Sequence, residues 1–146
     1  MTCLQPLASA AGLLAALWSA SAAAATCNVS PQSVNFGNYD TLASATVDGV
    51  GNVSVTCDAE TTFTIALGTG TGTYSARQMT SGANVLEYNL HTDASRLTVW
   101  GDGSAGTATV ARTAATAEVT VYGRLPARQN VPAGQYSDTL VVTVSY

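Results

Sequence analysis

Lysine is absent from this sequence of 146 residues, histidine occurs once, and charged residues make up only 10% of the chain. Five arginines and nine acidic residues give a net charge of −4. Surfaces that bind nucleic acid or anionic membranes depend on clustered basic side chains. The composition therefore argues against a nucleic-acid partner and against a polybasic membrane patch.

Charge is missing altogether from the first part of the chain, where no charged side chain precedes Asp40. A short apolar block covers residues 13–18. Residues 20–22 (Ala-Ser-Ala) and 23–25 (Ala-Ala-Ala) fit the small-x-small pattern that precedes a cleavage site. We therefore predict a secretory signal peptide over residues 1–25, although its leading region lacks the usual Lys or Arg. A transmembrane anchor is the alternative, but the block is too short to span about 30 Å of hydrocarbon.

Cysteine is also scarce. Cys3 would be removed with the signal peptide, which leaves Cys27 and Cys57. One pair in an oxidising compartment predicts a disulfide, and closing a loop of about 30 residues contributes about 3–4 kcal/mol by the chain-entropy argument. Two cysteines and a distant histidine are too few ligands for a metal site, and we expect no cofactor.

Helical periodicity is absent after residue 25, and strand patterns take its place. Apolar and polar residues alternate over residues 52–57, 62–67, 85–91 and 117–125, a shorter strand is predicted at 33–36, and the longest β-prone run covers 136–146. Glycine-rich or proline-containing turns separate these runs. Residues 105–117, rich in Ala and Thr, are expected to be extended or irregular rather than helical. Six or seven strands in about 120 residues predict one β-sandwich domain over residues 26–146.

Side chains that carry chemistry are few. A Ser/His/Asp hydrolase would have to use His91, which shares a strand face with Glu87 and Asn89 and is predicted to be solvated. The G-T-G-T-G run of residues 68–72 lacks the lysine and the helix of a phosphate loop, so a hairpin connection is predicted. A sugar could stack on Trp100 with Tyr88 and Tyr74, but such aromatics more often cover a sandwich core. We expect no enzyme.

Several segments together resemble the spore coat protein U domain family, to which the Csu-type subunits of archaic chaperone–usher pili belong. The segments are C-N-V at 27–29, V-N-F-G-N-Y-D at 34–40, V-S-V-T-C at 53–57, R-Q-M at 77–79, L-E-Y-N-L-H at 86–91, V-W-G-D at 99–102, P-A-G-Q-Y-S-D-T-L at 132–140 and V-T-V-S-Y at 142–146. The resemblance covers nearly all of residues 26–146. Each segment alone is a weak signal, whereas F-G-x-Y-D, the paired cysteines and G-x-Y-x-D-T are specific in combination.

The resemblance implies an immunoglobulin-like β-sandwich that lacks its last strand. In such subunits a periplasmic pilus chaperone fills the gap, an outer-membrane usher takes part in assembly, and a neighbouring subunit's amino-terminal extension replaces the chaperone strand. The expected function is a non-catalytic structural subunit of a bacterial surface fibre, exported through the periplasm to the cell surface. No small-molecule substrate is expected. The alternatives are a stand-alone secreted coat module and a ligand-binding adhesin domain.

One parity of the last predicted strand is expected to border the gap. Its members are Tyr136, Leu140, Val142, Val144 and Tyr146. A complete sandwich would be expected to continue with a further strand after Tyr146. An edge left uncovered there invites aggregation unless a partner binds it.

The segment before Cys27 predicts a position in the fibre. Cleavage after Ala25 would leave only Thr26 ahead of the disulfide, whereas a donor strand needs about five or six residues. The mature protein should therefore accept a strand without donating one, as a terminal or tip subunit. The alternative is cleavage near Ala10 or a different start codon, either of which would leave an Ala/Leu-rich segment as a donor strand. Mass spectrometry of the mature amino terminus, combined with light scattering, checks this expectation. Long homopolymers of purified mature protein would contradict it.

Overall fold

The computed structural model describes residues 24–146, and within them it contains seven β-strands and no helix. The strands are β1 (Cys27–Asn35), β2 (Val47–Leu67), β3 (Thr71–Gly72), β4 (Arg77–Ser81), β5 (Asn84–His91), β6 (Val110–Leu125) and β7 (Val142–Ser145). The prediction of an all-β domain is confirmed. Residues 1–23 of the predicted signal peptide lie outside the described residues. In the part that is described, no helix could cross a membrane.

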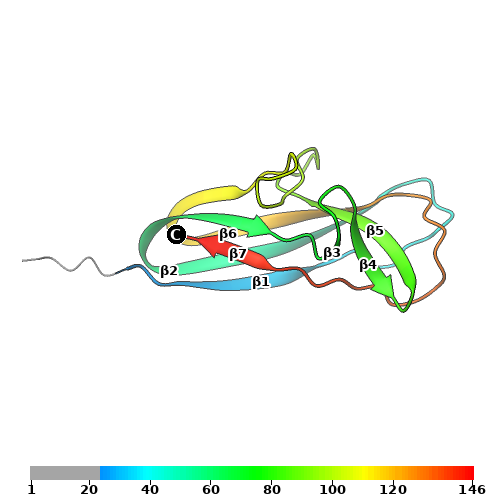
Figure 1. Ribbon diagram of the computed structural model, residues 1–146, viewed down its shortest axis with the longest axis horizontal. Helices are drawn as coiled ribbons and strands as arrows, with labels where there is room; N and C mark the ends of the chain where they lie inside the picture. Colours follow the sequence, from blue (N-terminus) through cyan, green and yellow to red (C-terminus); the bar gives the residue numbers. More distant parts are fainter. Residues whose placement is uncertain (1–23) are drawn as a thin grey trace, which may run out of the picture.

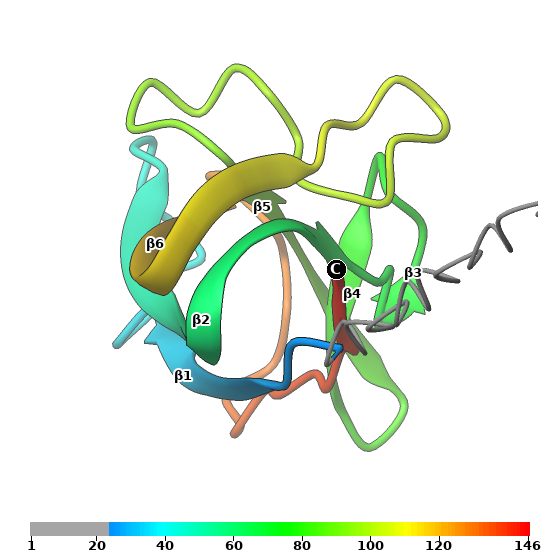
Figure 2. The ribbon, with the colours of Figure 1, turned by 90° about the vertical axis from the view of Figure 1, so that its left-hand side faces the viewer.

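Antiparallel pairing joins the strands in the order β1-β2-β6-β5-β4-β3, and β7 is attached to β2. β6 occupies one edge of β2 along most of its length. The other edge is shared, because β1 pairs with residues 50–57 of β2 and β7 pairs with residues 64–67. Figure 1 shows the elongated arrangement, and Figure 2 shows the sheet curling about the long axis of the domain. This curled sheet agrees with the expected immunoglobulin-like sandwich.

Alternating side chains form the core as the pattern predicts. The buried apolar residues are Val53, Val55, Cys57, Phe63, Ile65, Leu67, Leu86, Tyr88, Leu90, Trp100, Val110, Val119, Val121 and Leu125. Every second residue of a half-buried strand points to the same face, so one face of β2, β5 and β6 supplies most of this set. Trp100 comes from a loop, is 0% exposed, and donates its indole N–H to the Ile65 carbonyl at 3.0 Å.

Strand boundaries differ from the predicted ones in several places. The runs predicted at 52–57 and 62–67 belong to one strand, β2, which bends at a register shift between Thr56 and Thr61. The strand predicted at 33–36 begins at Cys27, because pairing with β2 extends back to the disulfide. β4 was not predicted, since its sequence R-Q-M-T-S does not alternate. The Ala/Thr-rich segment is extended from Val110 onward.

The predicted disulfide joins the ends of two neighbouring strands. Cys27 and Cys57 are directly opposite each other in the β1–β2 ladder, with a Cα–Cα distance of 4.0 Å. Next to them, the Asp58 N–H donates to the Thr26 carbonyl at 3.1 Å. Hydrogen-bonded and non-hydrogen-bonded pairs alternate in such a ladder, so the cysteines occupy a non-hydrogen-bonded pair, where side chains lie closest.

Removing this cross-link should destabilise the domain. We expect the double variant Cys27→Ser/Cys57→Ser to lose about 3 kcal/mol of unfolding free energy, because its unfolded chain regains the freedom that the closed loop lacks. Urea denaturation of the oxidised protein and of the variant gives the difference. A Ser30→Ala variant, which changes an exposed residue of the same strand, is the control. Equal midpoints for all three proteins would contradict the prediction.

Candidate functional site

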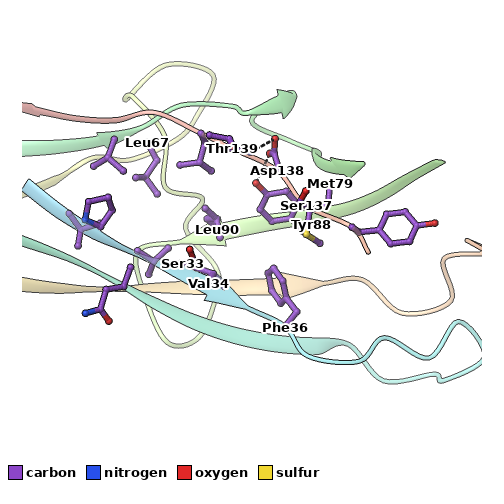
Figure 3. A pocket seen from close by; sticks show the side chains of 17 residues that line it. Ser33, Val34, Phe36, Leu67, Met79, Tyr88, Leu90, Ser137, Asp138 and Thr139 are labelled. Atoms are coloured by element: carbon purple, nitrogen blue, oxygen red, sulfur yellow. Dashed lines mark hydrogen bonds between the residues drawn. The ribbon is translucent and has the colours of Figure 1, made fainter. Parts of the chain in front are cut away.

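A groove separates β1 from the segment formed by residues 136–142. β1 pairs only with β2, and the 136–142 segment is bonded on its far side to β4 and β2. The groove between them has a volume of about 410 Å³. Figure 3 shows its two walls, with Ser33, Val34 and Phe36 on the β1 side and Ser137, Asp138 and Thr139 on the other.

The floor of the groove is the hydrophobic core itself. Val53, Leu67 and Leu90 line it, although each is at most 4% exposed. Val121 of β6 completes this floor. A ligand in the groove would therefore pack directly against core side chains.

A second cavity of about 690 Å³ continues the groove toward the loops at residues 37–41 and 131–135. Both cavities are lined by Phe36, Met79 and Tyr136, so they form one depression. The Phe36 ring meets the Tyr88 ring edge to face, with centroids 5.9 Å apart. Aromatic and methionine side chains give this junction an apolar and adaptable surface.

Three glycines shape the β1 wall. A Cβ at Gly123 would lie 2.6 Å from the Phe36 ring, and a Cβ at Gly51 would lie 2.8 Å from the Val34 side chain. Gly49 is equally close, with a Cβ position 3.0 Å from the Phe36 ring. Val34 and Phe36 therefore fit into a notch that only glycine leaves free, and this fixes the end of β1 beside the groove.

Asp138 holds the opposite wall. One carboxylate oxygen accepts the Tyr88 hydroxyl at 2.7 Å, and the other accepts the backbone N–H groups of Thr71 and Thr139 at 3.0 and 2.9 Å. Burial and this hydrogen bond to a carboxylate both raise the pKa of Tyr88. Asp138 thus ties the 136–142 segment to β3 and β5 while it faces the groove.

The buried cation Arg77 holds together the segments that pack against this wall. Arg77 is 0% exposed and has no carboxylate within salt-bridge distance in residues 24–146. Its guanidinium donates to the Gly68 carbonyl at 2.8 Å, to the Trp100 carbonyl at 2.7 Å and to the Asn89 side chain at 2.7 Å. Burial lowers the pKa of Arg77. These contacts tie the 68–72 connection and the Trp100 loop to β4 and β5.

The last-strand residues predicted to border the gap divide into two groups. Tyr136, Leu140 and Val142 line the groove. Val144 is half-buried in β7 against the core, and Tyr146 is 59% exposed at the end of the chain. The long strand predicted at 136–146 is regular only in β7, because residues 138–141 pass from β4 to β2 without continuous pairing.

One interpretation of the aromatic and titratable residues is wrong, and another is confirmed. His91 is 7% exposed rather than solvated, because the following loop folds back through a hydrogen bond from Thr92 N–H to the Thr98 carbonyl. Its Nδ1 lies 3.3 Å from the Tyr122 carbonyl, and burial lowers its pKa. Trp100 is fully buried, which confirms the expectation that it covers the core and removes it from any surface platform for sugars.

The remaining groove residues were not predicted as site residues. Pro31, Ser33 and Met79 line the groove, and Asp138 supports its wall. The sequence offers one signal for Pro31. Within sheets, proline is confined to edge strands, to the first residue of a strand and to bulges, so a proline among β-prone residues indicates an open strand edge. Among residues 24–146 no group of three His, Cys, Asp or Glu side chains is placed to hold a metal ion.

Comparison with known proteins places the chain in a family. It matches the Spore Coat Protein U domain (SCPU) over residues 13–143. Protein U of Myxococcus xanthus is 35% identical over 127 residues, which cover 77% of this chain and 71% of that protein. The chain therefore belongs to the Spore Coat Protein U domain family, and the resemblance seen in its motifs is confirmed.

A solved structure shares the fold. It is the CsuC–CsuE chaperone–tip adhesion subunit pre-assembly complex from the archaic chaperone–usher Csu pili of Acinetobacter baumannii. A chain of that complex superimposes with a TM-score of 0.60 at 22% identity, over 84% of the present chain and 40% of the other. The present chain thus spans about two fifths of that chain's length, and the likeness shows the fold alone.

The hydrogen bonds of Asp138 predict a measurable effect on stability. We expect Asp138→Ala to lower the unfolding free energy by about 2–3 kcal/mol, since hydrogen bonds to a charged group contribute about 1.5–3 kcal/mol and the Tyr88 hydroxyl loses its partner. Urea denaturation measures the loss, and hydrogen exchange should show faster exchange of the Thr71 amide. Glu118→Ala, on the exposed face of β6, is the control and should change neither. An unchanged midpoint would show that the carboxylate does not hold the wall.

Proposed function

We propose that this protein is a non-catalytic structural subunit of a bacterial surface fibre of the chaperone–usher type, and that its groove receives a β-strand from another chain. The first partner is a periplasmic chaperone, and a neighbouring subunit replaces it after the outer-membrane usher takes up the complex. Export begins with the leader at residues 1–25. Family membership and the fold shared with a chain of a chaperone–pilus subunit complex support this assignment.

The observation that carries the proposal is a pair of unpaired backbone edges on either side of an apolar floor. On the β1 side, the hydrogen-bonded pair Thr26–Asp58 sets the alternation. Backbone groups of even-numbered residues such as Asn28 and Ser30 therefore point to β2, and those of odd-numbered residues such as Val29 point to the groove.

The other edge is open in the same way. Ser137 exchanges both of its backbone hydrogen bonds with Thr80, and the Val141 carbonyl accepts the Gly68 N–H at 2.8 Å. In this segment the backbone groups of odd-numbered residues thus point to β4 and β2. The backbone groups of Asp138 and Leu140 therefore point toward the groove. Within residues 24–146 these groups have no hydrogen-bond partner.

An extended β-strand in the groove can both pair with the two open backbone edges and cover the apolar floor. Its N–H and C=O groups pair with the two edges, and its inward side chains fill the groove and pack against the apolar floor. A small molecule would cover the floor and leave most of the backbone groups unpaired. The groove therefore suits a polypeptide strand with apolar residues at alternate positions.

A subunit of this kind does no chemistry. Both described cysteines are joined in the disulfide, and the histidine is buried beside a backbone carbonyl. The groove lining holds serine and threonine hydroxyls, but it contains no His, Lys or Cys, and its one carboxylate, Asp138, already accepts three hydrogen bonds. The hydroxyls therefore have no neighbouring base that could activate them. The structural role is therefore favoured over an enzymatic one.

Filling the groove in cis tests the proposal. We extend the full chain after Tyr146 with a short Gly/Asn turn and ten residues that alternate Val and Thr, so that the extension can fold back as a hairpin along residues 136–146. Burial of the new valines should raise the unfolding temperature by about 10 °C. A matched extension with Ser in place of every Val is the control.

Thermal unfolding and light scattering of the three proteins measure the outcome. The Val/Thr extension should also abolish binding of an added Val/Thr peptide, because the groove is then occupied. If the two extensions have the same effect on unfolding temperature, the groove does not accept a strand. A stand-alone coat module with a closed surface would behave in that way.

A further inference from the structure

Pro31 occupies the middle of the free edge of β1. It stands opposite Val53 in the ladder with β2, between Ser30 and Gln32, whose backbone groups point to β2. The alternation directs the backbone of Pro31 away from β2 and into the groove. Proline has no N–H, so it leaves the β1–β2 ladder intact and removes one donor from the groove edge.

A register shift also limits the edge that β1 presents to the groove. Pairing with β2 changes register between Gln32 and Asn35, which bends the strand just beyond Pro31. Pro31 itself lines the groove and is exposed, whereas Cys27 and Val29 of the same parity are half-buried. Before this bend, β1 therefore offers the groove the N–H of Val29, and the next groove-facing position, Pro31, offers none.

The opposite edge has no such gap. The groove-facing residues of the last segment are Tyr136, Asp138, Leu140 and Val142, and each carries a backbone N–H. A strand in the groove would find a full series of donors and acceptors on this side. The two walls of the groove thus differ in hydrogen-bonding capacity, although both are unpaired.

We propose that Pro31 is a specificity-determining residue of the groove. An entering strand takes its main ladder from the edge at residues 136–142, and the β1 edges of two unfilled copies cannot complete a ladder with each other. Exposed strand edges are templates for association, and proline on an edge suppresses it. The occupant is an extended segment of another protein with apolar residues at alternate positions. This inference rests on the proposed function of the groove.

Substituting Pro31 tests it in the full-length chain. Pro31→Ala restores the N–H, so the unfilled protein should associate at a several-fold lower concentration than wild type, as one added hydrogen bond changes affinity by about two- to ten-fold. Light scattering over a concentration series measures this. Pro126→Ala, which replaces an exposed proline outside both cavities, is the matched control and should behave as wild type.

Pro31→Ala in the protein with the Val/Thr extension tests whether the increased association arises at the groove edge of β1. There the groove is filled and the β1 edge is covered, so the substituted and unsubstituted proteins should both be monomeric. A second variant, Pro31→Ala/Val29→Pro, moves the missing donor by two residues along the same edge and should restore the association behaviour of wild type.

The remaining outcomes distinguish a failure of the role of Pro31 from a failure of the proposed function. If the extension raises the unfolding temperature but Pro31→Ala associates no more readily than wild type, the role of Pro31 is refuted and the strand-accepting groove stands. A Pro31→Ala protein that does not fold even with the extension also refutes it, because Pro31 then serves the fold. If the extension has no effect on either protein, the proposed function itself fails.

Discussion

The antiparallel ladder between β2 and β6 is the interaction on which the rest of the structure depends. It occupies one edge of β2 over most of the strand, so every other partner of β2 must bind the opposite edge. β1 takes the first part of that edge and β7 takes the last part. The chain that leads to β7 therefore crosses from β4 to β2, and it passes β1 without a strand between them. The groove is a direct result of this strand order.

Two charged side chains keep the walls of the groove in place, and neither does so through a salt bridge. Asp138 accepts hydrogen bonds from a hydroxyl and two backbone N–H groups, and Arg77 donates to two backbone carbonyls and an amide. Neutral dipoles that surround a charge can satisfy it without a counterion, but they must be held in fixed positions. These two residues therefore hold the irregular connections at residues 68–76 and 138–141 in fixed positions through hydrogen bonds.

Much of the fold could be predicted from the sequence because alternation is a local property. Val53, Val55 and Cys57 are buried in β2 as their spacing indicates, and the disulfide follows from a single pair of cysteines. β4 and the burial of His91 could not be predicted in this way. Both depend on contacts with segments far away in the sequence, which no local pattern records.

The site was predictable only in part for the same reason. Tyr136, Leu140 and Val142 share the parity of the groove wall, and the resemblance to a family drew attention to them. Pro31, Met79 and Asp138 come from three separate segments that meet only after the sheet curls. A hydrophobic pattern gives the direction of a side chain, but the identity of its neighbours is decided by strand order.

The position of the disulfide bears on how the domain carries mechanical load. A force applied to the chain ahead of Cys27 passes through the cross-link into Cys57, in the middle of the longest strand. β1 therefore cannot be peeled from β2 one hydrogen bond at a time from its amino-terminal end. The load is transferred along β2 to its ladder with β6, where many hydrogen bonds must yield together in shear. A covalent bond at one end of a short strand thus gives the domain the tensile behaviour of its longest ladder.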